Sequence, residues 1–380
     1  MITAIIGANY GDEGKGLAVN YFTREGKNLV VRHNGGAQSG HTVEVGDKRF
    51  VFHELSSGSF NGAATFWDHT YHPDLYTLSN EINAFYNLTG STPEIYCDKN
   101  AKITIIDDVI LNQFREDSIH KAGSCGMGIW ECVCRNNAGY GIPIQIVKDW
   151  TIEELFKELV RIRDKYVIPR AISWSRPNLV DFSKNTYGQL LFDTTLLKNY
   201  VIEIKHNIDS IKLVGCLGQI SDKFDNIVYE SGQGLLLDGD YDTAHGTPSR
   251  TGIYNIANSV HSLGKTLDEV VYVTRTYLTR HGMGDLANEG GYGVTDKTNV
   301  FNQWQGALRY GAFEDIRDLE ERIKADCKCI NVKPHLLVTH TNVTGGKFIT
   351  ADGLADISDL NLEKIYLSDN KFTVSDTLLK

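Results

Sequence analysis

A glycine-rich turn near the amino terminus combines a lysine with a carboxylate, and this combination points to phosphate chemistry. An apolar run over residues 2–6 leads into residues 11–16, which read Gly-Asp-Glu-Gly-Lys-Gly. Glycines let backbone N–H groups approach an anion, Lys15 adds a positive charge, and the N-terminus of a following helix favours negative charge. Asp12 would repel a phosphate unless it binds a metal or accepts a proton. The turn therefore predicts a reaction as well as binding.

This turn is not a Walker A motif. That motif has a glycine five residues before its Gly-Lys pair and a Ser or Thr after the lysine, whereas this chain has Asn9 and Gly16 at those positions. From the residues alone, a glycine-rich strand-to-helix turn without a ligand stays open as the alternative.

A second candidate site is the loop of residues 33–42, which contains three glycines, two amides and two histidines in a polar turn after a predicted strand. Such loops carry function more often than strands do. His41 would serve as a general acid if other site residues converge on it. The alternative is an ordinary surface or capping histidine.

Two further polar turns lie in the final third of the chain. Gln233 follows the apolar residues 226–229, and residues 245–252 bring hydroxyl groups next to Arg250. Ligands bind at the carboxyl ends of strands in open α/β sheets, so Gln233 is a candidate binding residue. The arginine with its neighbouring hydroxyls is a candidate second phosphate site.

Apolar runs that alternate with helical patterns predict the elements that position these turns. Each predicted strand runs into a polar turn, which indicates an α/β fold with a mainly parallel central sheet flanked by helices and a P-loop-like phosphate cradle at one edge. No repeat or low-complexity linker interrupts the chain, so we predict one domain over residues 1–380. The predicted strands are 29–32, 102–106, 226–229, 270–274 and 336–339, with a hairpin at 43–45 and 49–52 and helices at 17–24 and 151–165.

Composition narrows the class of protein. The 380 residues carry a net charge of -10, which argues against a general nucleic-acid or membrane-surface binder, so we expect neither as a partner. The seven cysteines are an odd number without CxxC spacing, and no apolar run is long enough to cross a membrane. We therefore expect reduced cysteines and a cytoplasmic protein.

Four stretches, in order along the chain, resemble the adenylosuccinate synthetase family, which joins aspartate to a 6-oxopurine nucleotide with cleavage of a nucleoside triphosphate. They are residues 11–16, the Gly-His-Thr of residues 40–42, the Glu-Ser-Gly-Gln-Gly-Leu-Leu-Leu-Asp of residues 230–238, and the His-Gly-Thr of residues 245–247. The first two together are highly specific. The resemblance implies the adenylosuccinate synthetase fold and a homodimer.

The resemblance also implies catalytic roles. Asp12 would bind Mg²⁺ and remove the proton from purine N1, His41 would protonate or polarise O6, and Lys15 would hold the transferred phosphoryl group. The carbonyl of Gly40 would be a second magnesium ligand. The implied triphosphate-binding residues are Asn9, Gly11, Glu13, Gly14, Lys15, Gly16, Gly40, His41, Thr42 and Asn342.

The remaining substrates have their own implied residues. In the family an arginine reaches into the neighbouring subunit's nucleotide site, and Arg135 is the nearest equivalent here. The implied purine monophosphate-binding residues are Asp12, Asn34, Gln38, Ser124, Cys125, Arg135, Gln233, Leu237, Thr247 and Ser249. The implied aspartate-binding residues are Thr295, Lys297, Thr298 and Arg280, and Arg280 or Arg250 would be an alternative ligand of the 5′-phosphate.

Departures from the family pattern bear on the substrates. The arginine-rich aspartate loop is replaced by Thr-Asp-Lys-Thr-Asn at residues 295–299, and Met127 stands where an arginine is usual. Asn342 replaces an aspartate that accepts both guanine N1–H and N2–H in the donor GTP, which makes ATP or dATP the expected donor.

These departures and the short chain resemble the phage branch of the family, the 2-aminoadenylosuccinate synthetases that act on dGMP to supply diaminopurine for viral DNA. In that case the protein would work in a host cytoplasm. Many phage members have serine where this chain has Asp12, and this favours IMP as the alternative acceptor.

Two other classes stay open at this stage. A nucleotide-binding module without catalysis would use the same cradle, although it would need neither Asp12 nor His41. A different carboxylate–amine ligase would phosphorylate aspartate instead of the purine.

Asn342→Asp is expected to shift donor preference toward GTP, because a carboxylate accepts both guanine N–H groups in a charge-assisted pair. Turnover with ATP and with GTP, compared between the variant and the unchanged protein, measures the shift. An unchanged ATP/GTP ratio would contradict the assignment of Asn342 to the donor base.

Overall fold

The computed structural model describes residues 1–240, 245–296, 299 and 301–377, and within them ten strands form one large sheet. Neighbouring strands are parallel except for the antiparallel pair at one edge. The predicted mainly parallel α/β sheet is confirmed. In spatial order the strands are β16 (Ser375–Thr377), β15 (Ile365–Leu367), β12 (Pro334–Thr339), β9 (Glu269–Arg275), β1 (Ile2–Gly7), β8 (Asn226–Gly234), β2 (Asn28–Arg32), β5 (Ala64–Trp67), β6 (Ile95–Asp98) and β7 (Ile211–Val214).

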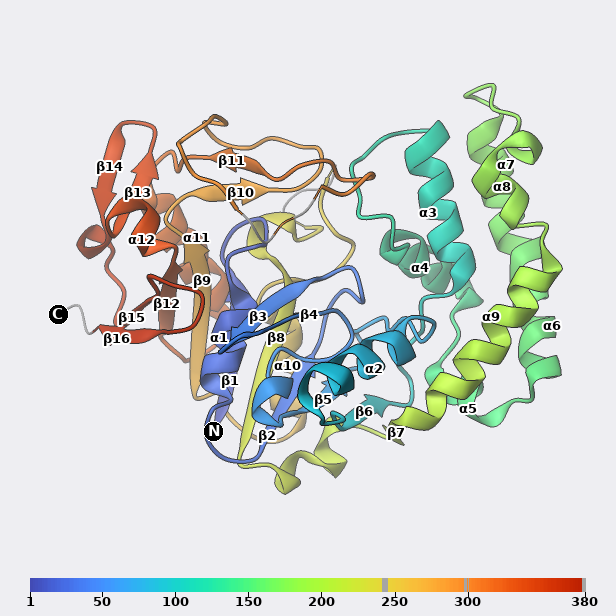
Figure 1. The fold of residues 1–380 in the computed structure, drawn as a ribbon, viewed down its shortest axis with the longest axis horizontal. Helices are drawn as coiled ribbons and strands as arrows, with labels where there is room; N and C mark the ends of the chain where they lie inside the picture. Colours follow the sequence, from blue (N-terminus) through green and yellow to red (C-terminus); the bar gives the residue numbers. More distant parts are fainter. Residues whose placement is uncertain (241–244, 297–298, 300, 378–380) are drawn as a thin grey trace.

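The central strands are apolar because helices cover both faces of the sheet. β1 and β2 are buried at every residue, as expected for parallel strands packed on both sides. Figure 1 shows α3 to α9 (green) clustered at one end of the sheet and β12 to β16 (red) at the other. The helices are α1 (Lys15–Phe22), α2 (Leu78–Thr89), α3 (Ile106–Ser118), α4 (Ile129–Arg135), α5 (Ile144–Asp149), α6 (Ile152–Ile162), α7 (Ile168–Ser175), α8 (Thr186–Leu190), α9 (Thr194–Asn207), α10 (Ile253–Ser262), α11 (Ile316–Asp326) and α12 (Thr341–Thr344).

Small hairpins lie beside the sheet. The predicted hairpin is confirmed as β3 (His41–Val45) paired with β4 (Lys48–Phe52). Two others are β10 (Leu278–Arg280) with β11 (Arg309–Gly311), and β13 (Lys347–Thr350) with β14 (Gly353–Asp356).

Two local predictions need correction. Residues 102–106 are not a strand: Lys102 makes an isolated bridge with Pro143, and α3 already begins at Ile106, where Asp108 accepts the N–H of Ile105. The strand predicted at 226–229 continues to Gly234, because its polar end still pairs with β1 across a register shift.

The sheet order fixes where the candidate residues meet. Five consecutive strands of the sheet run parallel: β12, β9, β1, β8 and β2. Their carboxyl ends therefore lie on the same side of the sheet, and the loops that follow them converge there. Among the described residues no helix is long and apolar enough to span a membrane.

Candidate active site

The turn between β1 and α1 forms a compact cradle around a buried carboxylate. Glu13 accepts hydrogen bonds from the N–H groups of Asn9 (3.1 Å) and Gly11 (2.7 Å) and from Lys15 Nζ (2.8 Å). Burial raises the pKa of Glu13, but the charge and hydrogen bond of Lys15 and the hydrogen bond from Gly11 outweigh it and hold the pKa below its ordinary value. Glu13 and Lys15 therefore form a buried salt bridge inside the turn.

Backbone geometry explains the glycines and the place of Asp12. Gly11, Asp12 and Gly14 have φ values of 105°, 61° and 100°, in the left-handed region. Side chains other than those of Asn and Asp rarely occur there. At Gly7 an added Cβ would lie 2.6 Å from Glu13 Oε2, so that position has no room for a side chain.

Neighbouring elements fix the cradle in place. Thr339, at the end of β12, donates to the carbonyl of Glu13 at 2.7 Å. Arg322 from α11 donates to the carbonyl of Ala8 (2.9 Å) and to Asn9 Oδ1 (2.7 Å). Sequence reasoning missed Arg322, because no motif near it in the chain marks it as a site residue.

His41 lies next to the cradle. An added Cβ on Gly16 in α1 would be 3.2 Å from the Cβ of His41. His41 Nδ1 donates to Glu230 Oε1 at 2.5 Å, and the N–H of Ser57 donates to the other oxygen at 3.2 Å. The Ser57 hydroxyl also donates to Glu230. The loop of residues 33–42 and the motif that begins at Glu230 thus meet through one hydrogen bond.

Of the two ring nitrogens of His41, Nδ1 pairs with Glu230 and Nε2 does not. Burial raises the pKa of Glu230, but His41 and Arg32 outweigh it and lower the pKa to about 2. Burial holds the pKa of His41 below its ordinary value, and Glu230 opposes that shift. His41 Nε2 is buried and has no hydrogen-bond partner among the described residues. Nε2 is thus the ring nitrogen of His41 that is available for a further hydrogen bond.

Several residues predicted to bind the purine nucleotide also come together. Asn34 Nδ2 donates to Gln233 Oε1 (3.3 Å), and Asn34 Oδ1 accepts from the N–H of Gly232 (2.9 Å). Ser249 Oγ accepts from the N–H of Gly35 (3.2 Å). The amide of Gln38 is buried and has no partner within the described part of the chain. These contacts place three predicted segments in one polar region.

The predicted loop at residues 124–128 lies against other loops at the same edge. The N–H of Met283 donates to the carbonyl of Ala122 (3.4 Å), and an added Cβ on Gly126 would contact the ring of Trp304. Ser124 Oγ accepts from Asn112 at 2.8 Å. Burial raises the pKa of the Cys125 thiol to about 11, so it stays protonated.

Other predicted residues are engaged elsewhere. Arg135 is fully buried, pairs with Asp108 at 2.8 Å and donates to the carbonyl of Tyr140, so it does not extend from the surface toward a neighbouring subunit. Arg280 donates to the carbonyls of Met283 and Asp285 and lies over the ring of Tyr10.

The remaining positions are more open. Asn342 is exposed in α12, just beyond the end of β12. Thr295 is exposed, and the N–H of Thr247 donates to the carbonyl of Leu237 at 2.7 Å. Lys297 and Thr298 lie outside the described residues. Arg250 forms an ion pair with Asp240 near the surface.

Asp12 and Gly40, the two predicted magnesium ligands, are both accessible. The side chain of Asp12 is 25% exposed and Gly40 is exposed, so both can reach a ligand. Mg²⁺ is usually held by one or two carboxylates together with substrate phosphates and water. In the described ranges, no group of three or more His, Cys, Asp or Glu side chains could hold a metal ion without further ligands.

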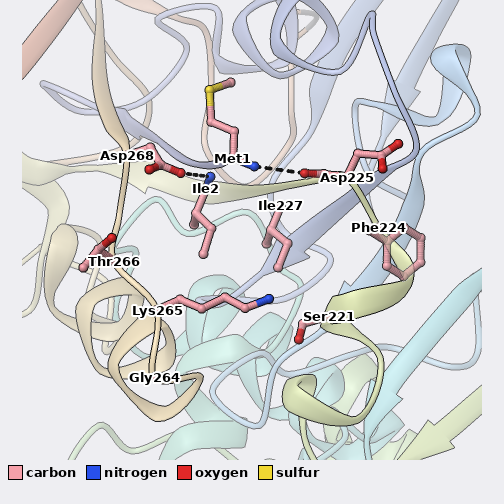
Figure 2. A pocket seen from close by; sticks show the side chains of 10 residues that line it. All are labelled: Met1, Ile2, Ser221, Phe224, Asp225, Ile227, Gly264, Lys265, Thr266 and Asp268. Atoms are coloured by element: carbon pink, nitrogen blue, oxygen red, sulfur yellow. Dashed lines mark hydrogen bonds between the residues drawn. The ribbon is translucent and has the colours of Figure 1, made fainter.

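A hollow of about 360 Å³ lies at the opposite edge of the sheet (Figure 2). It is lined by the first residues of β1 and by Lys265 and Asp268, where Asp268 accepts the N–H of Ile2 at 2.6 Å. Because it borders the amino ends of the strands, it is separate from the loops described above.

Comparison with known proteins agrees with the motifs. The model of the adenylosuccinate synthetase family matches residues 4–306. The adenylosuccinate synthetase of Petrotoga mobilis is 31% identical over 301 residues, covering 75% of this chain and 65% of the relative's length. That of Clostridium botulinum is 26% identical over 337 residues, covering 82% and 72%.

Two solved structures share the fold. Fully ligated adenylosuccinate synthetase from Plasmodium falciparum gives a TM-score of 0.66 at 22% identity, covering 96% of this chain and 79% of that one. The succinoaminodeoxyadenylate synthetase of cyanophage S-2L, bound to dGMP and to dATP as an energy donor, gives 0.63 at 12% identity and covers 99% and 95%.

Glu230→Gln is expected to reduce the loss of folding stability in acid. The folded pKa of about 2 lies below the ordinary 4.5, so the ionised carboxylate stabilises the fold above about pH 4.5 and this contribution is lost as the pH falls toward 2. The difference corresponds to about 3 kcal/mol. Urea unfolding of both proteins at several pH values measures it, with exposed Asp222→Asn as the control. An equal loss of stability in acid for the unchanged protein and for Glu230→Gln would contradict this prediction.

Proposed function

The chain belongs to the adenylosuccinate synthetase family of carbon–nitrogen ligases, and we propose that it joins L-aspartate to C6 of dGMP with ATP or dATP as the phosphate donor. The product would be 2-amino-2′-deoxy-N6-succinyladenylate. The observation that carries the proposal is the pairing of an Asp12-containing phosphate cradle with His41, whose Nε2 is buried and unpartnered among the described residues.

The first step would transfer a phosphoryl group to the purine. Asp12 accepts the proton from N1, and the electrons move to O6, which attacks the γ-phosphorus while the bond to the nucleoside diphosphate breaks. Lys15 neutralises charge on the phosphoryl group. A magnesium ion bound by Asp12 and the carbonyl of Gly40 would supply further charge neutralisation at the phosphates.

His41 would act at O6. With Nδ1 donating to Glu230, the ring can donate from Nε2 only when it holds a second proton. Glu230 favours that protonated form, which opposes the effect of burial. Negative charge that develops on O6 beside Nε2 would favour the protonated form of His41 further. His41 would therefore stabilise O6 most strongly when O6 carries negative charge.

The second step would replace phosphate by the amine of aspartate. Phosphorylation converts O6 into part of a good leaving group. The amine attacks C6, the C6–O bond breaks, inorganic phosphate leaves and the nitrogen loses a proton. We propose that the segment around Thr295 to Thr298, with Arg280, receives the carboxylates of the amino acid.

The donor assignment rests on Asn342 and its surroundings. α12 follows β12, whose Thr339 contacts Glu13 in the cradle, so a base near Asn342 would belong to the triphosphate that the cradle holds. An amide lacks the second carboxylate oxygen that guanine pairing uses. The cyanophage structure, which contains dATP as its energy donor, supports a donor other than GTP.

The acceptor assignment has support from the same neighbour. That structure contains dGMP, and the alignment covers nearly all of both chains. Asp12 would accept a hydrogen bond from the 2-amino group of guanine as well as the N1 proton. The retained Asp12 and the curated relatives named adenylosuccinate synthetase favour IMP as the alternative acceptor. We also propose a homodimer.

Phosphate release tests the proposal directly. The protein is assayed with L-aspartate and Mg²⁺ in four combinations, dGMP or IMP with ATP or GTP. Aspartate-dependent release with dGMP and ATP is expected. Turnover on IMP alone would replace dGMP by IMP, and release from none of the four would favour a binding module. Transfer of ¹⁸O from purine O6 into phosphate separates purine phosphorylation from phosphorylation of aspartate.

Asp12→Ala and His41→Ala are each expected to lower turnover by about 10²- to 10⁴-fold, the usual contribution of general acid–base groups. Asp222→Ala and His335→Ala are controls of the same residue types away from the cradle. Circular dichroism reports whether each variant folds. Turnover of a folded Asp12→Ala or His41→Ala variant close to that of the controls would contradict the mechanism.

A further inference from the structure

Asp12 is held through both its backbone and its side chain by residues that are distant in the sequence. Arg275, at the end of β9, donates from Nε to the carbonyl of Asp12 at 2.5 Å. His281, in the turn after β10, places Nε2 3.5 Å from Asp12 Oδ2. The peptide unit and the carboxylate thus have separate partners.

These two partners are themselves connected. Arg275 forms an ion pair with Asp296 at 2.5 Å, and both side chains are almost fully buried. Asn299 donates its N–H and its side-chain Nδ2 to the Asp296 carboxylate at 3.2 and 3.1 Å. His281 Nε2 lies 3.2 Å from Asn299 Oδ1. The contacts therefore close into a ring of Asp12, Arg275, Asp296, Asn299 and His281, called the Asp12 ring below.

The chemistry of the ring is consistent in every contact. His281 Nε2 faces two acceptors, the carboxylate of Asp12 and Oδ1 of Asn299, so this nitrogen carries the proton. Arg275 has enough donors to serve both the Asp12 carbonyl and Asp296, and its Nη1 also donates to the Tyr277 hydroxyl at 3.2 Å. Each contact of the ring therefore pairs a donor with an acceptor, whereas the other ring nitrogen of His281, Nδ1, is buried without a hydrogen-bond partner among the described residues.

The ring also explains how Asp12 keeps its backbone conformation. Its φ of 61° is uncommon for a residue other than glycine, and such conformations persist when surrounding contacts hold them. Arg275 fixes the carbonyl while His281 contacts the carboxylate. Asp296 and Asn299, which lie in or next to the segment proposed above to bind aspartate, provide the rest of the ring.

We propose that Arg275, Asp296, Asn299 and His281 are positioning residues that fix the backbone and the carboxylate of Asp12. The ring makes the position of the proton acceptor depend on the segment that receives the amino acid. This inference rests on the proposed function, because it gives Asp12 the role of base. Its specific consequence is that breaking the ring at His281 or Asn299 lowers kcat more than it weakens nucleotide binding.

His281→Phe, Asn299→Ala and the double variant test the ring. Each single variant is expected to lower kcat by about tenfold or more, since small displacements of a reacting group have effects of that size. The double variant should be no slower than the slower single one, because either change opens the same ring. The dissociation constant for the nucleotide, from calorimetry, should stay within about twofold. His281→Gln, which keeps an N–H donor, should recover part of kcat.

Asp107→Asn is the matched control. Asp107 forms a buried ion pair with Arg163 at 2.6 Å between helical segments, with exposures similar to those of the Arg275–Asp296 pair. Asp296→Asn should lower kcat of the folded protein, whereas Asp107→Asn should lower the melting temperature and leave kcat of the folded protein unchanged. Equal kcat losses in both, unchanged kcat in the His281 and Asn299 variants, or effects that multiply in the double variant would overturn the proposal.

Failure of the proposed function would be recognised separately, as absence of aspartate-dependent phosphate release from the unchanged protein. The ring is then judged by the melting temperatures of His281→Phe, Asn299→Ala and the double variant. Shifts that are smaller in combination than their sum support the ring. Melting-temperature shifts that add up in the double variant would overturn the Asp12 ring without any measurement of activity.

Discussion

The carboxylate of Glu13 inside the β1–α1 turn is the interaction on which the candidate site depends. An isolated carboxylate would be costly to bury, and here two backbone N–H groups and Lys15 offset that cost. The same contacts draw Asn9, Gly11 and Lys15 around one point. The turn therefore has a defined shape without a phosphate, with the Glu13 carboxylate as the partner of these donors.

The parallel strands bring residues from several strand ends to the β1–α1 turn. β9 pairs with β1 and β12 pairs with β9, all in parallel, so Arg275 can reach the carbonyl of Asp12 and Thr339 can reach Glu13. On the other side of β1, β8 supplies Glu230 to His41. An antiparallel arrangement would send neighbouring strand ends to opposite edges, and these residues would not meet. The sheet direction is thus a condition for the chemistry.

Sequence reasoning succeeded where the signal was local. The β1 turn, the β3–β4 hairpin and the strands β9 and β12 each carry their pattern within a few residues, and all four were found. It failed at residues 102–106, where an apolar run pairs only through one bridge, because strand formation needs a partner that the run itself does not reveal. Contacts between distant residues were also missed. His41 and Glu230 are 189 residues apart, and no pattern linked them.

The resemblance to a family identified which residues converge but not how they are held. It pointed to Asp12 and His41, yet gave no indication of Arg322, Arg275 or His281, which act on the turn through hydrogen bonds to backbone or to another side chain. A single sequence contains no record of such contacts. Arg135 shows the converse case, because a matched position turned out to lie in a fully buried ion pair with Asp108.

The carboxylates near the cradle differ in what they can do. Glu13 has a lowered pKa and is engaged by Lys15, and Glu230 has a pKa of about 2 and is engaged by His41 and Ser57. Both are therefore too acidic and too fully hydrogen-bonded to take a proton from a substrate near neutral pH. The side chain of Asp12 is 25% exposed and meets His281 only at 3.5 Å. Among the described residues, Asp12 is the one of the three that combines solvent access with a carboxylate oxygen that has no partner, and this difference makes it the carboxylate suited to the proposed reaction.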